Sequence, residues 1–305
     1  MKLEGIHHIT AITENAQRNV DFYVGVLGLR LVKKTVNQDN PTVYHLFFAD
    51  EEGDAGSDLT FFEYPGAPAG RPGAGMVHRI VWRVASTEAL DFWAERLGAN
   101  GTESTREGDG LVFSDPEGLE HELLVVEVPD QPLIADHPEV PGEVALQGFH
   151  AVRAYAASPD DSTGLLEALE FEQVTGGWEA RGEQRGGRYL FDQAPSERGL
   201  QGAGSVHHVA WASTPEQLLD WREKALAGGA QPTPEIDRFY FRSIYFREPS
   251  GVLFEIATLG PGFTVDEPLE SLGEKLSLPP DYEHLREEVE PRLRPVVNPR
   301  VRSQG

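Results

Sequence analysis

The sequence predicts an α+β fold of four βαβββ modules, in which one helix separates an opening strand from about three later strands. Three observations predict it. A histidine-bearing strand that begins at a glycine occurs four times, a helix candidate follows each occurrence, and short strands joined by Pro/Gly turns come after the helices. The length of 305 residues allows about two domains, and 39% hydrophobic residues suffice for a folded core.

The opening strands are four β-rich runs in which a glycine precedes an apolar residue and a histidine. They are Gly5–Ile12, Gly75–Val84, Gly148–Tyr155 and Gly204–Trp211. The second and fourth runs share the same Gly-Ala-Gly turn at their start. Repetition of one pattern along the chain indicates an internal repeat.

A helix candidate follows each opening strand: Asn15–Leu27, Thr87–Leu97, Ser158–Leu169 and a segment from Thr214 to Gly228. In the first, apolar residues recur at i, i+3, i+4 and i+7, which gives one buried stripe, and a glycine ends the pattern. The fourth begins Thr-Pro-Glu-Gln, which matches a capping box with proline at the first helical position.

Two strand pairs near the module ends are marked by tight turns. Gly110–Phe113 and Leu119–Val126 flank Asp-Pro-Glu-Gly, and Phe239–Arg247 and Val252–Ala257 flank Glu-Pro-Ser-Gly. Proline and glycine at these offsets favour hairpins.

The repeat predicts two domains of two modules each, over residues 1–128 and 148–260. Residues 129–147 link them, and the proline-rich part of this linker, Pro129–Gly142, is expected to be exposed. Residues 261–305 form a C-terminal tail with one acidic helix candidate, Asp281–Val289.

Charge and composition exclude several classes of protein. The 50 acidic and 26 basic residues give a net charge of −24, so no basic face for nucleic acid is expected. No apolar stretch approaches the roughly 18 residues of a membrane span, and the first residues lack the apolar centre of a signal peptide. We therefore expect a cytoplasmic protein without nucleic-acid or membrane partners. The sequence leaves open whether it forms a homo-oligomer.

Alignment of the modules selects among the ten histidines. The first histidine position is filled in every module, whereas the second holds His8 in module one and His208 in module four, but Arg79 and Ala151 in modules two and three. Because neighbouring side chains of a strand point to opposite faces, only one histidine of each pair can face a given cleft. The chain has no cysteine, so any metal must be held by His, Asp or Glu.

A glutamate recurs in the last strand, as Glu122 in module two and Glu255 in module four. Glu255 lies in an otherwise apolar strand, where a carboxylate is costly unless it is paired or binds a metal. A cleft shared by modules one and four would hold His8, His208 and Glu255. Two imidazoles and one carboxylate on one face of a metal are typical of non-haem Fe(II) oxygenases, although Mn(II) suits similar ligands and Zn(II) usually prefers a tetrahedral site. Spacing alone would choose His150 in place of His8.

These modules resemble the vicinal oxygen chelate superfamily, which includes glyoxalases, bleomycin-resistance proteins and extradiol dioxygenases. The segments GIHHITAIT, NAQRNVDFYVGVLGLRLVKKTVN, GSVHHVAW and YFREPSGVLFEIAT resemble ring-cleaving dioxygenases of the hydroquinone 1,2-dioxygenase type. The likeness extends from about residue 3 to residue 260.

The resemblance implies two glyoxalase-like domains with a metal cleft, and ring cleavage that inserts O₂ into a small dihydroxylated aromatic of the hydroquinone or catechol kind. The expected cofactor is Fe(II), with Mn(II) as the other candidate. The implied metal ligands are His8, His208 and Glu255, and the implied catalytic residues around them are His7, His207, Arg238 and Tyr245. Tyr245 lies ten residues before Glu255 on the partner strand of the last hairpin, so the two are expected to be neighbours.

Two other functions remain open at this point. A glyoxalase-like lyase or isomerase would need a fourth protein ligand from the late strand of module one, where Glu63 is the only carboxylate of Leu59–Tyr64. A non-enzymatic protein that sequesters a small molecule would need no metal, and the two histidines with one glutamate argue against it.

Overall fold

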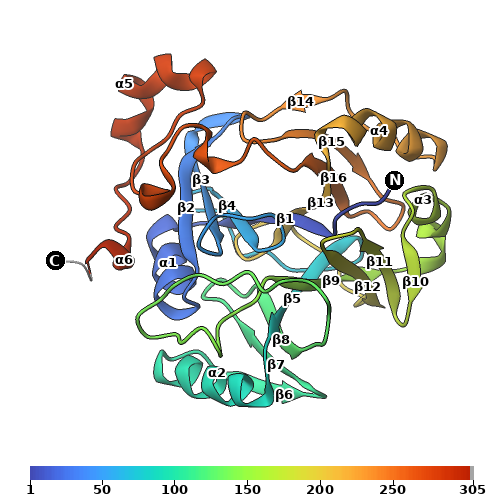
Figure 1. Ribbon diagram of the computed structural model, residues 1–305, viewed down its shortest axis with the longest axis horizontal. Coiled ribbons are helices and arrows are strands. Elements are labelled where there is room, and N and C mark those ends of the chain that lie inside the picture. Colours follow the sequence, from blue (N-terminus) through green and yellow to red (C-terminus); the bar gives the residue numbers. More distant parts are fainter. Residues whose placement is uncertain (303–305) are drawn as a thin grey trace.

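The computed structural model describes residues 1–302 and contains the four expected modules (Figure 1). Module one comprises β1 (Ile6–Thr13), α1 (Ala16–Val20) with a π-helical continuation (Asp21–Val26), β2 (Arg30–Asn37), β3 (Asn40–Ala49) and β4 (Asp58–Glu63). Module two comprises β5 (Met76–Val84), α2 (Thr87–Ala99), β6 (Ser104–Glu107), β7 (Gly110–Ser114) and β8 (Glu120–Val125). The α+β class and the module order predicted from the repeat are thereby confirmed for the first half of the chain.

The second half repeats the same order. Module three comprises β9 (Phe149–Ala156), a 3₁₀ turn (Pro159–Ser162), α3 (Thr163–Ala168), β10 (Glu172–Val174), β11 (Gly177–Arg181) and β12 (Gly186–Gln193). Module four comprises β13 (Val206–Ser213), a 3₁₀ turn (Pro215–Gln217), α4 (Leu218–Ala227), β14 (Ile236–Asp237), β15 (Arg242–Arg247) and β16 (Leu253–Thr258). The tail contains short 3₁₀ segments (Phe263–Val265, Leu269–Ser271, Pro280–Leu285, Glu290–Arg292), α5 (Arg286–Val289) and α6 (Pro299–Arg302).

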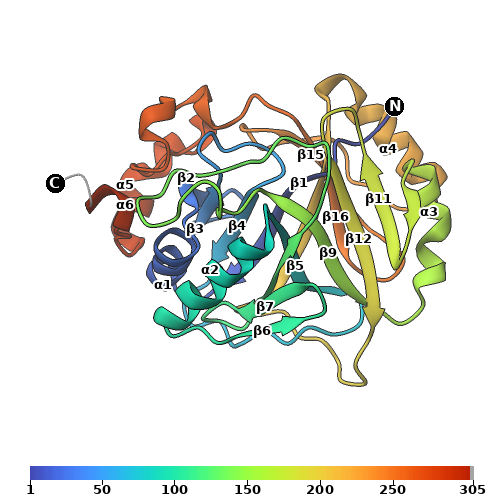
Figure 2. The same ribbon diagram turned by 60° about the horizontal axis from the view of Figure 1, so that its bottom comes forward.

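Each of the two sheets joins one module from the first half of the chain to one module from the second half. One eight-stranded sheet has the order β14-β15-β16-β13-β1-β4-β3-β2 and joins modules four and one, and the other has the order β10-β11-β12-β9-β5-β8-β7-β6 and joins modules three and two. Antiparallel pairing of β1 with β13, and of β5 with β9, makes the two joints. Figure 2 shows β9, β11 and β12 of the second sheet side by side. The division into domains at residues 1–128 and 148–260 stays a prediction.

The glycine that opens each module has a conformational reason. Gly5, Gly75, Gly148 and Gly204 all have positive φ, between +72° and +91°, where other L residues are strained. At Gly204 a Cβ would also lie 2.1 Å from the carbonyl oxygen of Glu117. The recurring glycine therefore turns the chain sharply into each opening strand.

Two helices begin with side-chain caps. The Asn15 side chain accepts from the backbone N–H of Arg18 at 3.0 Å, and Ser86 caps α2 in the same way. The capping box predicted at Thr214 is wrong, because this side chain makes no cap bond and the chain forms a 3₁₀ turn before α4. Proline still occupies the first position of that turn, as its fixed φ favours.

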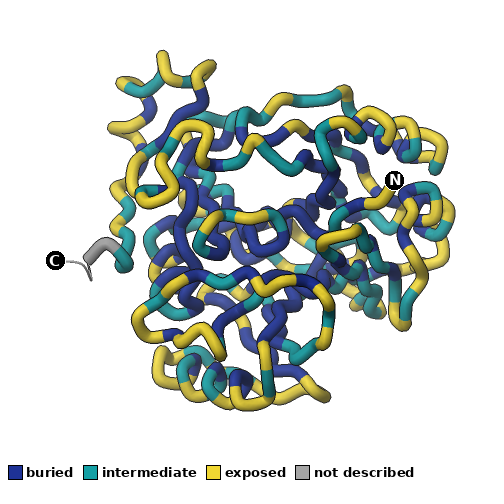
Figure 3. Tube along the Cα trace, viewed as in Figure 1, coloured by how far each residue is buried: buried dark blue, intermediate teal, exposed yellow. Residues whose placement is uncertain are grey.

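The core lies in the strands and in the apolar faces of the helices that cover them, while exposed residues follow the periphery (Figure 3). A second, smaller apolar cluster joins the tail to strands of the first sheet. Its members come from both halves and the tail: Val32, Phe47, Ala49, Ala210, Tyr240, Phe241, Ala257, Phe263 and Leu272. The tail therefore packs against the first sheet next to β2 (Figure 1).

Two connecting segments differ from expectation. The segment Pro129–Gly142 is not a solvated linker throughout, because Leu133, Ala135 and Val140 are buried. The tail helix expected over Asp281–Val289 is mostly 3₁₀ and becomes α-helical only at Arg286. Within residues 1–302 no helix is both long and apolar enough to cross a membrane.

Candidate metal centre

Three buried side chains from three neighbouring strands meet on one face of the first sheet. His8 comes from β1, His208 from β13 and Glu255 from β16. The strand register explains the meeting, because Ala210 pairs with both His8 and Glu255 and lies two residues after His208. Paired residues, and residues two apart, share a face of a sheet. We refer to His8, His208 and Glu255 as the cluster.

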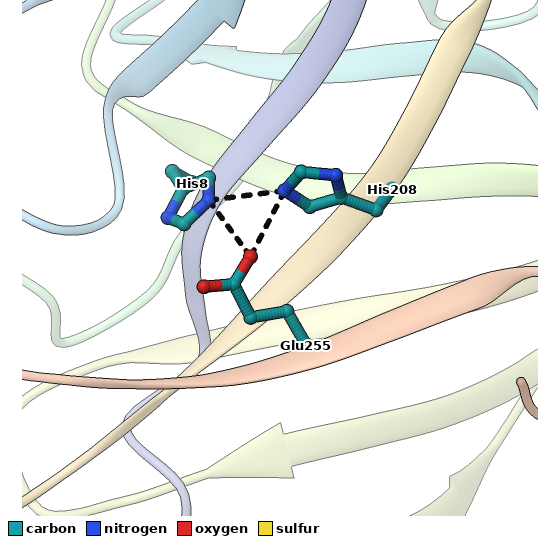
Figure 4. Close-up of side chains that lie close together, drawn as sticks. All are labelled: His8, His208 and Glu255. Atoms are coloured by element: carbon teal, nitrogen blue, oxygen red, sulfur yellow. Dashed lines mark hydrogen bonds and ion pairs between the residues drawn. The ribbon is translucent and has the colours of Figure 1, made fainter. Parts of the chain in front are cut away.

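The cluster has the dimensions of one face of a metal coordination sphere (Figure 4). Nε2 of His8 lies 3.3 Å from Nε2 of His208, and these nitrogens lie 3.2 Å and 2.9 Å from Oε2 of Glu255. Ligands about 2.1 Å from an ion are about 3.0 Å apart at octahedral angles and about 3.4 Å apart at tetrahedral angles. The three distances together are closer to the octahedral value.

The Glu255 carboxylate has one satisfied and one unsatisfied oxygen. Oε1 accepts hydrogen bonds from the hydroxyls of Tyr245, at 3.0 Å, and Ser243. Oε2 is buried and has no hydrogen-bond partner within residues 1–302. Burial alone would raise the pKa of Glu255, but without a metal the positive charge and N–H groups that His8 and His208 can supply outweigh it and hold that pKa well below its usual range. A buried anionic oxygen without a donor is costly unless a cation lies beside it.

The histidine before His8 fixes the proton on His8. Burial and, secondarily, His8 lower the pKa of His7 to about 3, so this imidazole is neutral. Its Nε2 faces the carbonyl oxygen of Thr258 at 3.2 Å and must therefore carry the proton. Its Nδ1 then accepts from Nδ1–H of His8 at 2.9 Å. Nε2 of His8 is left with a lone pair that points at the cluster centre, as a metal ligand requires.

A bulge in β1 makes this arrangement possible. The register between β1 and β13 shifts between Ile6 and His8, so His7 is not forced to the opposite face of the sheet. The rings of His7 and His8 meet edge to face, 5.1 Å apart. Simple strand alternation would have separated them.

The second His-His pair makes the same contact, but its outer histidine is exposed to solvent. Nδ1 of His207 lies 2.8 Å from Nδ1 of His208. Burial lowers the pKa of His208, and Glu255 opposes the shift. His207 itself is exposed, whereas His7 is only 7% exposed. When Nδ1 carries the proton in both cluster histidines, as the Nδ1–Nδ1 contacts allow, both Nε2 atoms and Oε2 of Glu255 direct lone pairs at one point, where a divalent metal replaces the proton that would otherwise lie between them.

The remaining predicted site residues extend from the cluster toward solvent. Tyr245 pairs with Glu255 in the β15–β16 hairpin, as the ten-residue spacing predicted. Burial and the charge of Glu255 raise the pKa of Tyr245, so its hydroxyl keeps the proton that it donates. Nε of Arg238 lies 3.3 Å from the Tyr245 oxygen, and the same guanidinium pairs with Asp39 of the β2–β3 turn at 3.0 Å.

The cluster lies at the wall of a cavity of about 360 Å³. Phenylalanine and tyrosine rings form part of the rest of this wall, and Phe241 contacts His8 with ring centroids 5.1 Å apart. Residues that line the cavity besides the cluster include Asn37, Asp39, His45, Phe47, Phe62, His207, Arg238, Tyr240, Phe241 and Tyr245. An apolar chamber with a few polar groups at defined points suits a small aromatic molecule.

Module one offers no fourth ligand to the cluster. In module four, Glu255 pairs with the residue two positions after the cluster histidine. The same register position in module one is Thr60, which pairs with Thr10 and is hydrogen-bonded to it at 2.7 Å. Glu63 is three residues further along and points away, where Oε1 accepts from the backbone N–H of Ala16 at 2.9 Å. The fourth ligand that the lyase alternative would require from Glu63 is therefore not at the cluster.

The equivalent place in the second sheet is occupied by charged pairs. Arg79 takes the position of the cluster histidine and forms ion pairs with Glu107, Glu120 and Glu122 at 3.1, 3.2 and 3.5 Å. His150, the residue favoured by spacing alone, lies on β9 of this sheet and not in the cluster. The recurrence of Glu122 thus reflects the repeat without a second set of histidines.

Several residues that contact the cluster or line the cavity were not singled out in the sequence. Ser243 precedes Tyr245 by two residues and so shares its face, a signal that strand alternation provided. Asp39, His45 and Phe241 reach the cavity only through contacts between distant segments. No local pattern marks such residues.

Comparisons with known proteins place these features in context. A model of the family described as "Glyoxalase/Bleomycin resistance protein/Dioxygenase superfamily" matches residues 5–123 and 135–256. The chain is 42% identical over 304 residues to "Putative ring-cleaving dioxygenase MhqO" of Bacillus subtilis (strain 168), covering 96% of this chain and 97% of that protein. It is 33% identical over 317 residues to "Chlorohydroquinone/hydroquinone 1,2-dioxygenase" of Sphingobium indicum, covering 94% of this chain and 95% of that protein.

A solved structure shares the whole fold. The crystal structure of a protein titled "putative dioxygenase from Bacillus subtilis" superimposes with a TM-score of 0.90 at 40% identity. The match covers 97% of this chain and 98% of that chain. The similarity thus includes both sheets and the tail.

Proposed function

Because the chain belongs to the Glyoxalase/Bleomycin resistance protein/Dioxygenase superfamily, we propose that it is an Fe(II)-dependent ring-cleaving dioxygenase that acts on a small dihydroxylated aromatic and O₂. One observation carries the proposal: two imidazole nitrogens and one carboxylate oxygen converge at 2.9–3.3 Å, and Thr60 stands where a fourth ligand would be. Three ligands on one face leave positions open for two substrates, as in the two-histidine, one-carboxylate oxygenases.

His8, His208 and Glu255 would hold the metal. When bound, Fe(II) would lower the pKa of a phenolic hydroxyl and allow electrons to pass from the aromatic to O₂. Mn(II) is the alternative ion for the same ligands. The names of the relatives support the reaction class and agree with an aromatic substrate.

The surrounding residues would hold ligands and protons in place. His7 keeps Nε2 of His8 unprotonated, and Tyr245 holds Oε1 of Glu255 so that Oε2 faces the metal. His207, exposed at the cavity, would accept or return a proton of the substrate hydroxyl. Arg238, beside the Tyr245 oxygen, would stabilise negative charge that develops on the ring oxygen.

The cavity walls would orient the substrate and exclude water. Phe47, Phe62 and Phe241 offer flat apolar surfaces that orient an aromatic ring and exclude water. Orientation of the ring toward the cluster converts an encounter of separate reactants into a reaction at fixed distance.

Oxygen consumption tests the proposal. The protein is purified without oxygen, loaded with Fe(II) and given hydroquinone or catechol in air-saturated buffer. We expect uptake with at least one of them, and loss of both iron and uptake in His8→Ala, His208→Ala and Glu255→Ala. Retention of nickel or zinc without oxygen uptake, or oxygen uptake that persists without any metal, would overturn it.

A further inference from the structure

His45 lies in the cavity at a distance from the cluster. It is on β3, where it pairs with Phe62 of β4, and β4 separates β3 from the strand that carries His8. Strands are about 4.8 Å apart, so His45 stands about two strand spacings from β1. Its side chain lines the same cavity as the cluster and is half-buried. Nothing in the proposed handling of metal or oxygen uses it.

One ring nitrogen of His45 is anchored and the other is free to act. Nε2 lies 2.9 Å from the hydroxyl oxygen of Thr60, which is itself hydrogen-bonded to Thr10. Within residues 1–302 the other nitrogen, Nδ1, has no hydrogen-bond partner. It is not fully buried, so it keeps some accessible surface. Burial is the main cause that holds the pKa of His45 well below its usual value, so the ring is neutral.

Aromatic rings line the part of the cavity between His45 and the cluster. Phe62 lies between them, with ring centroids 4.4 Å from His45 and 6.4 Å from His208. Phe47, two residues further along β3, also contacts His45, with ring centroids 4.0 Å apart. An aromatic ring lying along Phe62 would thus have one edge at the cluster and the opposite edge toward His45.

We propose, on the basis of the proposed dioxygenase function, that His45 binds the distal hydroxyl of a 1,4-dihydroxylated ring and thereby selects hydroquinones over catechols. The two hydroxyls of a hydroquinone lie at opposite ends of the ring, so one reaches the cluster while the other meets Nδ1. The two hydroxyls of a catechol are adjacent, so both lie near the cluster and His45 has nothing to bind. A phenolic hydroxyl both donates and accepts, so it suits either tautomer that the Thr60 contact allows.

This role predicts a specific change in selectivity. In His45→Phe the ring shape is retained but the polar nitrogen is lost, and a site that loses its partner for a substrate hydroxyl discriminates less. We expect kcat/KM for hydroquinone to fall tenfold or more and kcat/KM for catechol to change less than about threefold. His45→Gln, which restores a polar group at this place, should recover part of the hydroquinone activity.

Binding without turnover gives an independent measure. The dissociation constants of hydroquinone and catechol are measured by calorimetry on the Fe(II)-loaded protein in the absence of O₂. We expect wild type to bind hydroquinone more tightly, and His45→Phe to lose that preference while it keeps its iron. His284→Phe, which replaces an exposed histidine of the tail, is the matched control and should behave as wild type.

The outcomes separate the two claims. Absence of oxygen uptake by wild type with both substrates contradicts the dioxygenase proposal, whereas the ratio of hydroquinone to catechol tests His45. Equal losses for both compounds in His45→Phe would show a merely structural residue. A wild type that binds hydroquinone no more tightly than catechol would overturn the role of His45 regardless of turnover.

Discussion

The two His-His pairs provide a test in which each residue is the other's control. His7 and His207 make the same Nδ1–Nδ1 contact to a cluster histidine, at 2.9 Å and 2.8 Å. They differ in setting, because His7 is 7% exposed and His207 is exposed to solvent. The perturbation is His7→Phe compared with His207→Phe.

The difference in exposure sets the expected magnitude. In His7→Phe, Nδ1–H of His8 is left buried without an acceptor, and the proton can move to Nε2, where Oε2 of Glu255 lies 3.2 Å away. A metal must then displace that proton. Loss of such an outer partner typically costs 10- to 100-fold in metal affinity, or about 1.4–2.8 kcal/mol. In His207→Phe water can replace the lost acceptor, so the loss should be below about tenfold.

Anaerobic titration of Fe(II) against a chromophoric chelator measures both affinities, and circular dichroism checks that each variant is folded. We expect His7→Phe to bind iron at least several-fold more weakly than His207→Phe. Equal losses in the two variants, or a larger loss in His207→Phe, would refute the reasoning from burial and from the assigned proton positions.

Three further predictions concern the cluster, its open side and the tail. Glu255→Gln removes the only anion of the cluster and should abolish retention of Fe(II) through gel filtration, whereas His150→Ala, in the other sheet, should keep most of it; the reverse pattern would contradict the ligand assignment. Thr60→Glu adds a carboxylate at the open register position, so metal should be retained while oxygen uptake falls tenfold or more; unchanged uptake would argue against an open position there. Lys33→Met removes a fully buried ammonium that pairs with two carboxylates of residues 261–302, so urea unfolding should show a loss of about 3 kcal/mol and limited proteolysis should cut the tail faster; unchanged stability would mean that this pairing does not fasten the tail.

The sequence allowed much of the fold to be predicted because its repeat is visible. A glycine with positive φ marks the start of each module, and a Pro/Gly turn marks the last strand of modules two and four. Alignment of the modules then distinguished His8 and His208 from His150, and the structure brings these two together with Glu255. The chemical roles of these side chains stay proposals, but their meeting follows from strand register.

What the sequence could not reveal depends on exact register and on distant contacts. Glu63 was considered as a ligand because it is the only carboxylate in its strand, but register puts Thr60 at that place and the alternation of faces turns Glu63 away. The bulge beside His7 breaks alternation without a sequence signal. The ion pair of Arg238 with Asp39 joins residues 199 positions apart, and no local pattern predicts such a contact.

A crystal structure of the Fe(II)-loaded protein, with anomalous scattering recorded on both sides of the iron absorption edge, would locate the ion directly. We expect a single strong peak in contact with Nε2 of His8, Nε2 of His208 and a carboxylate oxygen of Glu255, with no fourth protein ligand. A peak elsewhere, or an ion held by four side chains, would contradict the three-ligand oxygenase centre.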